Sequence, residues 1–198
     1  IQYHWSNGAT TASIVVNPNI TTSYSVTVTN RFRCTDDATV TVNVSALPNA
    51  AIAGNNICAG GSTTLTASGG TSYVWNTGQT TTSINVSPST STTYTVTVTN
   101  ASGCTAATSR LVVVSANPVA SITGGTSICI GSNTTLTAAG GSSYLWSNAA
   151  TTAAITVSPV VNTTYTVTVT NSAGCTDTES RTVTVNGLTI NALVSGPD

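Results

Sequence analysis

The stretch TTYTVTVTNASGC at residues 92–104 decides the fold, because the chain contains it three times. It recurs as TSYSVTVTNRFRC at 22–34 and as TTYTVTVTNSAGC at 163–175. In each copy tyrosine and valine alternate with threonine or serine, which is the period-2 pattern of a β-strand with one buried face and one hydroxyl-rich face. The copies lie 70 and 71 positions apart, and a fixed period of this kind predicts a tandem array of small domains.

Other short segments complete each unit of the array. In the third copy they are VASIT (119–123), NTTLTA (133–138), SYLWS (143–147), AAITVS (153–158), TYTVTVTN (164–171) and RTVTVN (181–186). These are about six short strands separated by turn residues, with no helical pattern between them, which favours an all-β sandwich.

The cysteines follow the same period. Cys34, Cys104 and Cys175 form one series, and Cys58 and Cys129 each lie 46 positions before a member of it. If the four strands after Cys129 run alternately down and up, the turn before Cys175 lies at the end of the sandwich where Cys129 lies. The pattern therefore predicts disulfides Cys58–Cys104 and Cys129–Cys175, each within one repeat.

Cys34 is left unpaired, because the same spacing puts its partner twelve positions before Ile1. Metal binding by the cysteines is excluded, since there is no Cys-x-x-Cys and His4 is the single histidine. Disulfides predict an oxidising compartment and therefore export from the cell.

The composition excludes several classes of function. Charged residues make up 5% of the chain and the net charge is −1, so no field attracts nucleic acid or an anionic membrane. No apolar run reaches the roughly 18 residues that a spanning helix needs, which predicts no membrane insertion. The chain has only five acidic residues, too few to supply calcium ligands between successive domains, and we predict no metal and no cofactor.

Few residues qualify as candidate sites. Trp5, Trp75 and Trp146 are predicted to be core residues, with sugar-stacking platforms as the alternative. Asp36 and Asp37, beside two arginines, are predicted to form a solvated turn, with a partner contact as the alternative. Catalysis by His4 would need a nucleophile and a carboxylate brought to it, and nothing in the sequence suggests either. We therefore predict no catalytic residue and no enzyme.

The motifs YxWSNGATTxSIxVxP, TTYTVTVTNxxGC and ICxGxSTTLTAxGG together resemble a known family. They are similar to the Ig-like (PKD-like) tandem repeats of large surface adhesins that gliding bacteria export by type IX secretion. The resemblance covers the whole chain. It implies Ig-like domains of about 70 residues and an extracellular, cell-surface location.

These observations predict a domain plan. Residues 1–46 are a partial Ig-like repeat that lacks its first strands, 47–116 and 117–187 are full repeats, and 188–198 are the leading strand of a further one. Two explanations of the partial repeat stay open: an arbitrary window on a long array, or a unit whose ends are completed by a neighbour.

The predicted function is a structural or adhesive repeat region of a large extracellular protein, acting as a stalk or fibre. One alternative is a filament subunit that assembles by strand complementation, because exposed strand edges pair with other strands. Another is a carbohydrate-binding accessory module of a secreted enzyme. Partners are then neighbouring repeats or identical subunits, with surface glycans and other cells as further candidates.

Overall fold

In the computed structural model, which describes residues 1–187, every regular element is a β-strand. This confirms the predicted fold class of disulfide-linked Ig-like β-sandwiches. The predicted strand in 188–198 lies outside the described residues. The described part contains no helix able to span a membrane.

The chain divides into two compact units. The first consists of Ile1–Ala53, Leu65–Ile84 and Thr93–Arg110, and the second of Gly54–Thr64, Asn85–Thr92 and the chain from Leu111 onward. The central repeat contributes residues to both units. The predicted domain boundaries remain a prediction.

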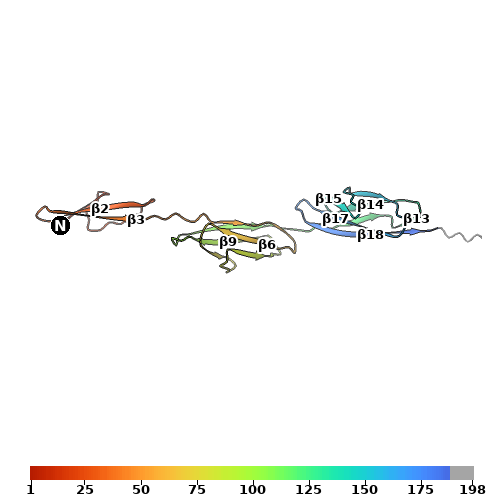
Figure 1. Ribbon diagram of the computed structural model, residues 1–198, viewed down its shortest axis with the longest axis horizontal. Coiled ribbons are helices and arrows are strands. Elements are labelled where there is room, and N and C mark those ends of the chain that lie inside the picture. The colour runs from red at the N-terminus through yellow and green to blue at the C-terminus, as the bar shows by residue number, and fades with distance from the viewer. Residues whose placement is uncertain (188–198) are drawn as a thin grey trace, which may run out of the picture. The chain divides into compact units, whose positions relative to one another are not determined.

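The second unit contains the sandwich of the third repeat. One sheet has the order β12 (Ser121–Gly124), β14 (Thr134–Ala139), β16 (Ala154–Val157). The other has the order β13 (Ser127–Cys129), β18 (Thr176–Asn186), β17 (Thr163–Thr170), β15 (Ser143–Trp146). Figure 1 shows these strands gathered in the green-blue to blue part of the chain.

The alternating apolar residues of both sheets meet in one core. Its buried members are Ile122, Ile128, Leu136, Ala138, Trp146, Ile155, Val157, Val167, Val169 and Val183. The Trp146 indole N–H donates to the Thr152 carbonyl at 2.9 Å, so the largest core side chain leaves no polar atom unpaired. On the outer face the threonines and serines of neighbouring strands hydrogen-bond to one another, as Thr166 and Ser180 do at 2.8 Å.

The central repeat forms equivalent strands from the equivalent sequence, except that the counterpart of β18 is divided into two strands. They are β4 (Ala51–Ala53), β5 (Ile57–Cys58), β6 (Thr63–Ser68), β7 (Ser72–Trp75), β8 (Ser83–Val86), β9 (Thr92–Thr99), β10 (Thr105–Val112) and β11 (Val114–Ser115). The sheets have the orders β4-β6-β8, β10-β9-β7 and β11-β5. Trp75 is 2% exposed, as Trp146 is.

Residues 1–46 form one antiparallel sheet of β1 (Gln2–Trp5), β2 (Thr22–Thr29) and β3 (Thr35–Val42), the red to orange strands in Figure 1. Its inward face is only half-buried at Trp5, Val26 and Val28, whereas the equivalent residues of the other repeats are 0–2% exposed. Residues 13–16 align with β8 and β16 but form no strand. A strand needs a partner for its backbone hydrogen bonds, and the described part of this repeat has no counterpart of β14 to provide one.

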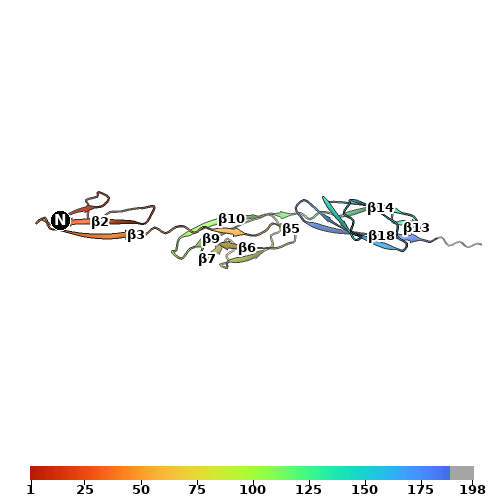
Figure 2. The same cartoon turned by 45° about the horizontal axis from the view of Figure 1, so that its top comes forward.

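A short parallel strand is the element that the sequence pattern did not predict. β13 pairs in parallel with the end of β18, with Cys129 opposite Asn186. Figures 1 and 2 both show β13 beside the last residues of β18. β5 pairs with β11 in the same way, with Cys58 opposite Ser115.

Gly140 gives a test of the turn that leads into β15. Its φ is +110°, and a Cβ there would overlap the Val119 carbonyl oxygen. We expect Gly140→Ala to lower the free energy of unfolding by about 2–4 kcal/mol, because the cost of the left-handed conformation adds to the cost of the backbone clash. Gly174→Ala is the matched control: φ is +82° but the Cβ meets nothing within 4 Å, so we expect about 1 kcal/mol. Equal losses in urea unfolding would contradict the packing described here.

Candidate functional site: a disulfide between two repeats

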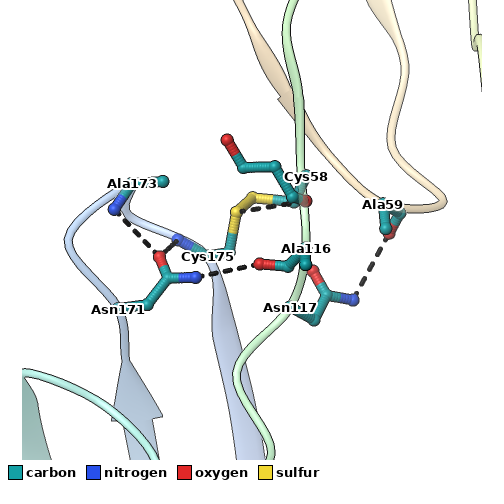
Figure 3. Close-up of a disulfide and its surroundings, with 8 residues drawn as sticks. Cys58, Ala59, Ala116, Asn117, Asn171, Ala173 and Cys175 are labelled. Carbon is teal, nitrogen blue, oxygen red and sulfur yellow. Dashed lines mark hydrogen bonds between the residues drawn. A yellow bond between two sulfur atoms is a disulfide. The ribbon is translucent and has the colours of Figure 1, made fainter. Parts of the chain in front are cut away.

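The distinctive chemical feature of the described chain is a disulfide between Cys58 and Cys175, which are 117 positions apart. Their Cα atoms are 5.6 Å apart, within the usual range for a disulfide. By sequence, Cys58 belongs to the central repeat and Cys175 to the third, and both lie in the second compact unit. The bond therefore joins two repeats, as Figure 3 shows in close-up.

This pairing corrects the predicted Cys129–Cys175 bridge. Cys175 immediately precedes β18, whereas Cys129 is paired with Asn186 at the far end of that strand. Eleven residues of strand at about 3.3 Å each separate the two positions by roughly 36 Å, far beyond the reach of a disulfide. The strand count failed because it assumed that the four strands after Cys129 alternate in direction, which would make β14 parallel to β16 and β15 parallel to β17. Both pairs are antiparallel in the structure.

The predicted Cys58–Cys104 bridge is also wrong, because Cys58 is bonded to Cys175 and Cys104 is a free thiol. Cys58 is held by β11, the last strand before the third repeat, where the Ala59 N–H donates to the Ser115 carbonyl at 2.8 Å. The parallel pairing thus places Cys58 at the junction between the repeats.

Asn171 connects the turn before Cys175 to that junction. Its Oδ1 accepts hydrogen bonds from the amides of Ala173 and Cys175, both at 3.0 Å. Its Nδ2 donates to the Ala116 carbonyl at 2.9 Å, as the dashed lines in Figure 3 show. Cys175 is 1% exposed, so water reaches the bond poorly from this side.

Two charged residues, which the sequence analysis did not single out, hold the first strand of the third repeat. Asp177 Oδ2 accepts the Ala120 N–H at 2.9 Å. The Arg181 guanidinium donates to the carbonyls of Ile122 and Gly124, both at 2.9 Å. These charge-assisted bonds fix the chain directly after the junction. Charged residues make up only 5% of the chain, and this scarcity is the sequence signal that could have indicated the two residues.

The turn before Cys104 in the first compact unit repeats the geometry of the Cys175 turn. Asn100 Oδ1 accepts the Cys104 N–H at 3.0 Å, and Asn100 Nδ2 donates to the Ala46 carbonyl at 2.8 Å. The Cys104 Sγ lies 3.9 Å from the Ser45 carbonyl oxygen, as the Cys175 Sγ lies 3.9 Å from that of Ser115.

The remaining cysteines, Cys34 and Cys129, are exposed free thiols in the structure. At Cys34, Asn30 Oδ1 again accepts the cysteine amide at 3.0 Å. The Asn-to-cysteine turn is therefore common to all three repeats, and the bonded state of its cysteine differs between them.

The other candidate residues take these places. Trp75 and Trp146 are buried in cores, Trp5 is half-buried, and His4 is exposed on β1. Asp36 and Asp37 lie on β3 and not in a turn, because they pair with Val28 and Thr27 of β2, although both are solvent-exposed as predicted. Among residues 1–187 no group of three histidine, cysteine or acidic side chains could hold a metal ion.

Substitutions of Asn171 test how the junction is held. Asn171→Ala removes an acceptor of two amides and a donor to the junction, so we expect a loss of about 2–3 kcal/mol in the free energy of unfolding. Asn171→Asp keeps the acceptor and loses the donor, so we expect about 1 kcal/mol. Urea unfolding of the oxidised chain measures both losses. A loss below about 0.5 kcal/mol for both variants would show that Asn171 does not hold the turn.

No protein-family model matches the sequence, and no curated protein matches it. Solved structures give remote matches. The three N-terminal domains of the bacteriophage RB49 Highly Immunogenic Outer Capsid protein are 20% identical with a TM-score of 0.40, over 69% of this chain and 58% of that one. A Ca²⁺-stabilised adhesin with which an Antarctic bacterium binds ice is 16% identical with a TM-score of 0.46, over 84% of this chain and 57% of that one.

The insect immune protein hemolin is 15% identical with a TM-score of 0.34, over 94% of this chain and 67% of that one. This chain thus spans less than two thirds of the phage protein and of the ice-binding adhesin. Similarity at this level does not identify a family for the chain.

Proposed function

We propose that this chain is a structural and adhesive repeat region of an extracellular surface protein, where it acts as a stalk or fibre. The observation that supports this most strongly is the Cys58–Cys175 disulfide, which ties one repeat to the next. A disulfide persists in an oxidising compartment, which supports a location outside the cell. The proposed role needs no catalytic residue, metal or cofactor.

The disulfide has a mechanical consequence that suits a stalk. Tension applied along the backbone passes from Cys58 to Cys175 through the sulfur atoms and bypasses the residues between them. The bypassed segment includes the strands from β6 to β17 and the junction at residues 116–120. Tension therefore cannot extend these strands while the bond is intact.

Single-molecule stretching of the chain from its two ends tests this proposal. The oxidised chain should keep residues 58–175 folded or looped, and reduction should release about 117 residues, or roughly 400 Å at about 3.5 Å per residue. The Cys58→Ala/Cys175→Ala variant is the control and should extend by that length without reductant. If the oxidised chain extends as far as the variant does, the disulfide does not protect the array and the stalk proposal fails.

A filament subunit is the second candidate, and a groove on the N-terminal sheet favours it. The groove has a volume of about 240 Å³ and is lined by Trp5, Tyr24, Val26, Ala38, Thr39 and Val40. In the third repeat the equivalent face is covered by the sheet of β12, β14 and β16. Light scattering of the concentrated oxidised chain checks this role: growth of long assemblies favours a filament, and a stable monomer opposes it.

The carbohydrate-binding alternative receives less support from the tryptophans. Trp75 and Trp146 are each 2% exposed, so neither ring face is open to stack on a sugar. Surface glycans and other cells stay candidate partners of the adhesive role, through residues other than these two.

A further inference from the structure

We propose that Cys104 and the N-terminal sheet form a half-site for a cysteine-bearing strand segment of the type found at residues 54–68. The cysteine of that segment would bond Cys104, not Cys34. Three independent observations support this assignment: the Cys104 turn, the backbone at residues 43–45, and the groove on the sheet of β1, β2 and β3. The proposal does not depend on the stalk role, since it concerns only which thiol is bonded.

The first observation is that Cys104 has the surroundings of a bonded cysteine. The same contacts surround Cys104 and Cys175. In each case an asparagine accepts the cysteine amide, and two carbonyls from the end of the preceding repeat lie against the turn. The equivalent pairs are Asn100 and Asn171, Ser45 and Ser115, and Ala46 and Ala116. In the Cys175 arrangement the cysteine forms its disulfide with Cys58. Cys34 has the asparagine turn, but among the described residues no junction carbonyl lies against it.

The second observation is a backbone segment held ready for a strand. The Val114 N–H donates to Ser91 Oγ at 3.0 Å, and the Val44 N–H donates to Thr21 Oγ1 at the same distance. In the central repeat this segment is β11, and it pairs with β5. No strand within residues 1–187 pairs with residues 43–45.

The strand that fits can be specified from the β5 pairing. There the N–H groups of Ile57 and Ala59 donate to the carbonyls of Val113 and Ser115, at 3.0 and 2.8 Å. The equivalent acceptors are the carbonyls of Asn43 and Ser45. A segment with the order Ile-Cys-Ala would therefore place its cysteine beside Cys104.

The third observation is the apolar groove. Leu136 of β14 is 0% exposed and packs in one core with Trp146 and Val167, whose equivalents in the N-terminal repeat are Trp5 and Val26. The residue equivalent to Leu136 in segment 54–68 is Leu65. The groove lined by Trp5 and Val26 is neutral, and residues 54–68 carry no charged residue, so no charge is desolvated on docking.

A peptide of residues 54–68 tests the site when its cysteine is activated as a mixed disulfide with thionitrobenzoate. The Cys104 thiol loses its proton to water, the thiolate attacks the peptide sulfur, and the coloured thionitrobenzoate thiolate leaves. We use intact chains that retain one free thiol: Cys34→Ser/Cys129→Ser for Cys104, and Cys104→Ser/Cys129→Ser for Cys34. Glutathione activated in the same way gives the intrinsic reactivity of each thiol.

We expect the ratio of peptide rate to glutathione rate to be at least about tenfold higher at Cys104 than at Cys34, because docking raises the effective concentration. Methylating the peptide nitrogen of Ala59 removes the donor to Ser45 and should abolish the difference. Equal ratios at both thiols, or an unchanged rate for the methylated peptide, would overturn the proposal.

Discussion

Replacing Cys58 and Cys175 together by alanine should lower the free energy of unfolding by about 5 kcal/mol. The disulfide closes a loop of 117 residues, and in the chain-entropy model a loop of this length restricts the unfolded chain by about that amount. A bridge within one repeat would close a shorter loop and contribute about 4 kcal/mol for each repeat. Urea unfolding of the oxidised chain and of the variant measures the difference.

Cys129→Ala is the matched control for this experiment. Cys129 is exposed and unbonded in the structure, so its removal should change the free energy of unfolding by less than about 0.5 kcal/mol. If Cys129→Ala instead destabilises the chain as much as Cys175→Ala does, Cys129 is the partner of Cys175 and the bond between repeats is wrong.

Trp146→Ala should lower the free energy of unfolding by about 3–5 kcal/mol, which is the usual loss when a buried tryptophan is truncated. Trp146 is 2% exposed, packs at the centre of the third repeat's core and donates its indole N–H to Thr152. The truncation therefore leaves a large cavity and an unpaired carbonyl. Thermal unfolding followed by circular dichroism measures the loss.

Trp5→Ala is the control that separates a complete sandwich from a single sheet. Trp5 makes the equivalent hydrogen bond, to the Thr11 carbonyl at 2.8 Å, but its ring is only half-buried. We expect a loss of about 1–2 kcal/mol, because less apolar surface is covered. Equal losses for both tryptophans would mean that the N-terminal sheet is covered as fully as the third repeat is.

The repeat period was predictable because the same motifs recur along the chain, and the strands were predictable because they depend on local alternation. In β17, valine and threonine alternate on a pleated surface, and this pattern by itself separates the buried face from the outer face. The tryptophans repeat in register with those strands, which indicated that they belong to the core. Burial of Trp75 and Trp146 follows from this same pattern.

The disulfide partners were not predictable from local pattern. β5 and β13 are two and three residues long, too short to show alternation. Their parallel pairing depends on contacts between distant residues, and it decides at which end of a repeat the cysteine lies. Spacing alone was also ambiguous, because in a periodic chain an offset of 46 and an offset of 117 occur together.

The hydrogen bonds that hold the junction are likewise tertiary. Asn171 has the appearance of an ordinary turn residue in the sequence, and its contact with Ala116 appears only when the turn meets the end of the preceding repeat. The scarcity of charge marks Arg181 in the sequence, but no local pattern identifies the β12 carbonyls as its acceptors, since the interaction joins residues 59 positions apart.

Peptide mapping without reduction tests most directly whether the disulfide joins two repeats. After free thiols are alkylated, trypsin cleaves the unfolded chain after its four arginines, Arg31, Arg33, Arg110 and Arg181, since the sequence has no lysine. Cys58 then lies in peptide 34–110 and Cys175 in peptide 111–181. We predict that these two peptides are recovered as one disulfide-linked species that separates on reduction, with alkyl groups on Cys34, Cys104 and Cys129. Recovery of 34–110 and 111–181 as separate peptides, each with an internal disulfide, would contradict the pairing between repeats.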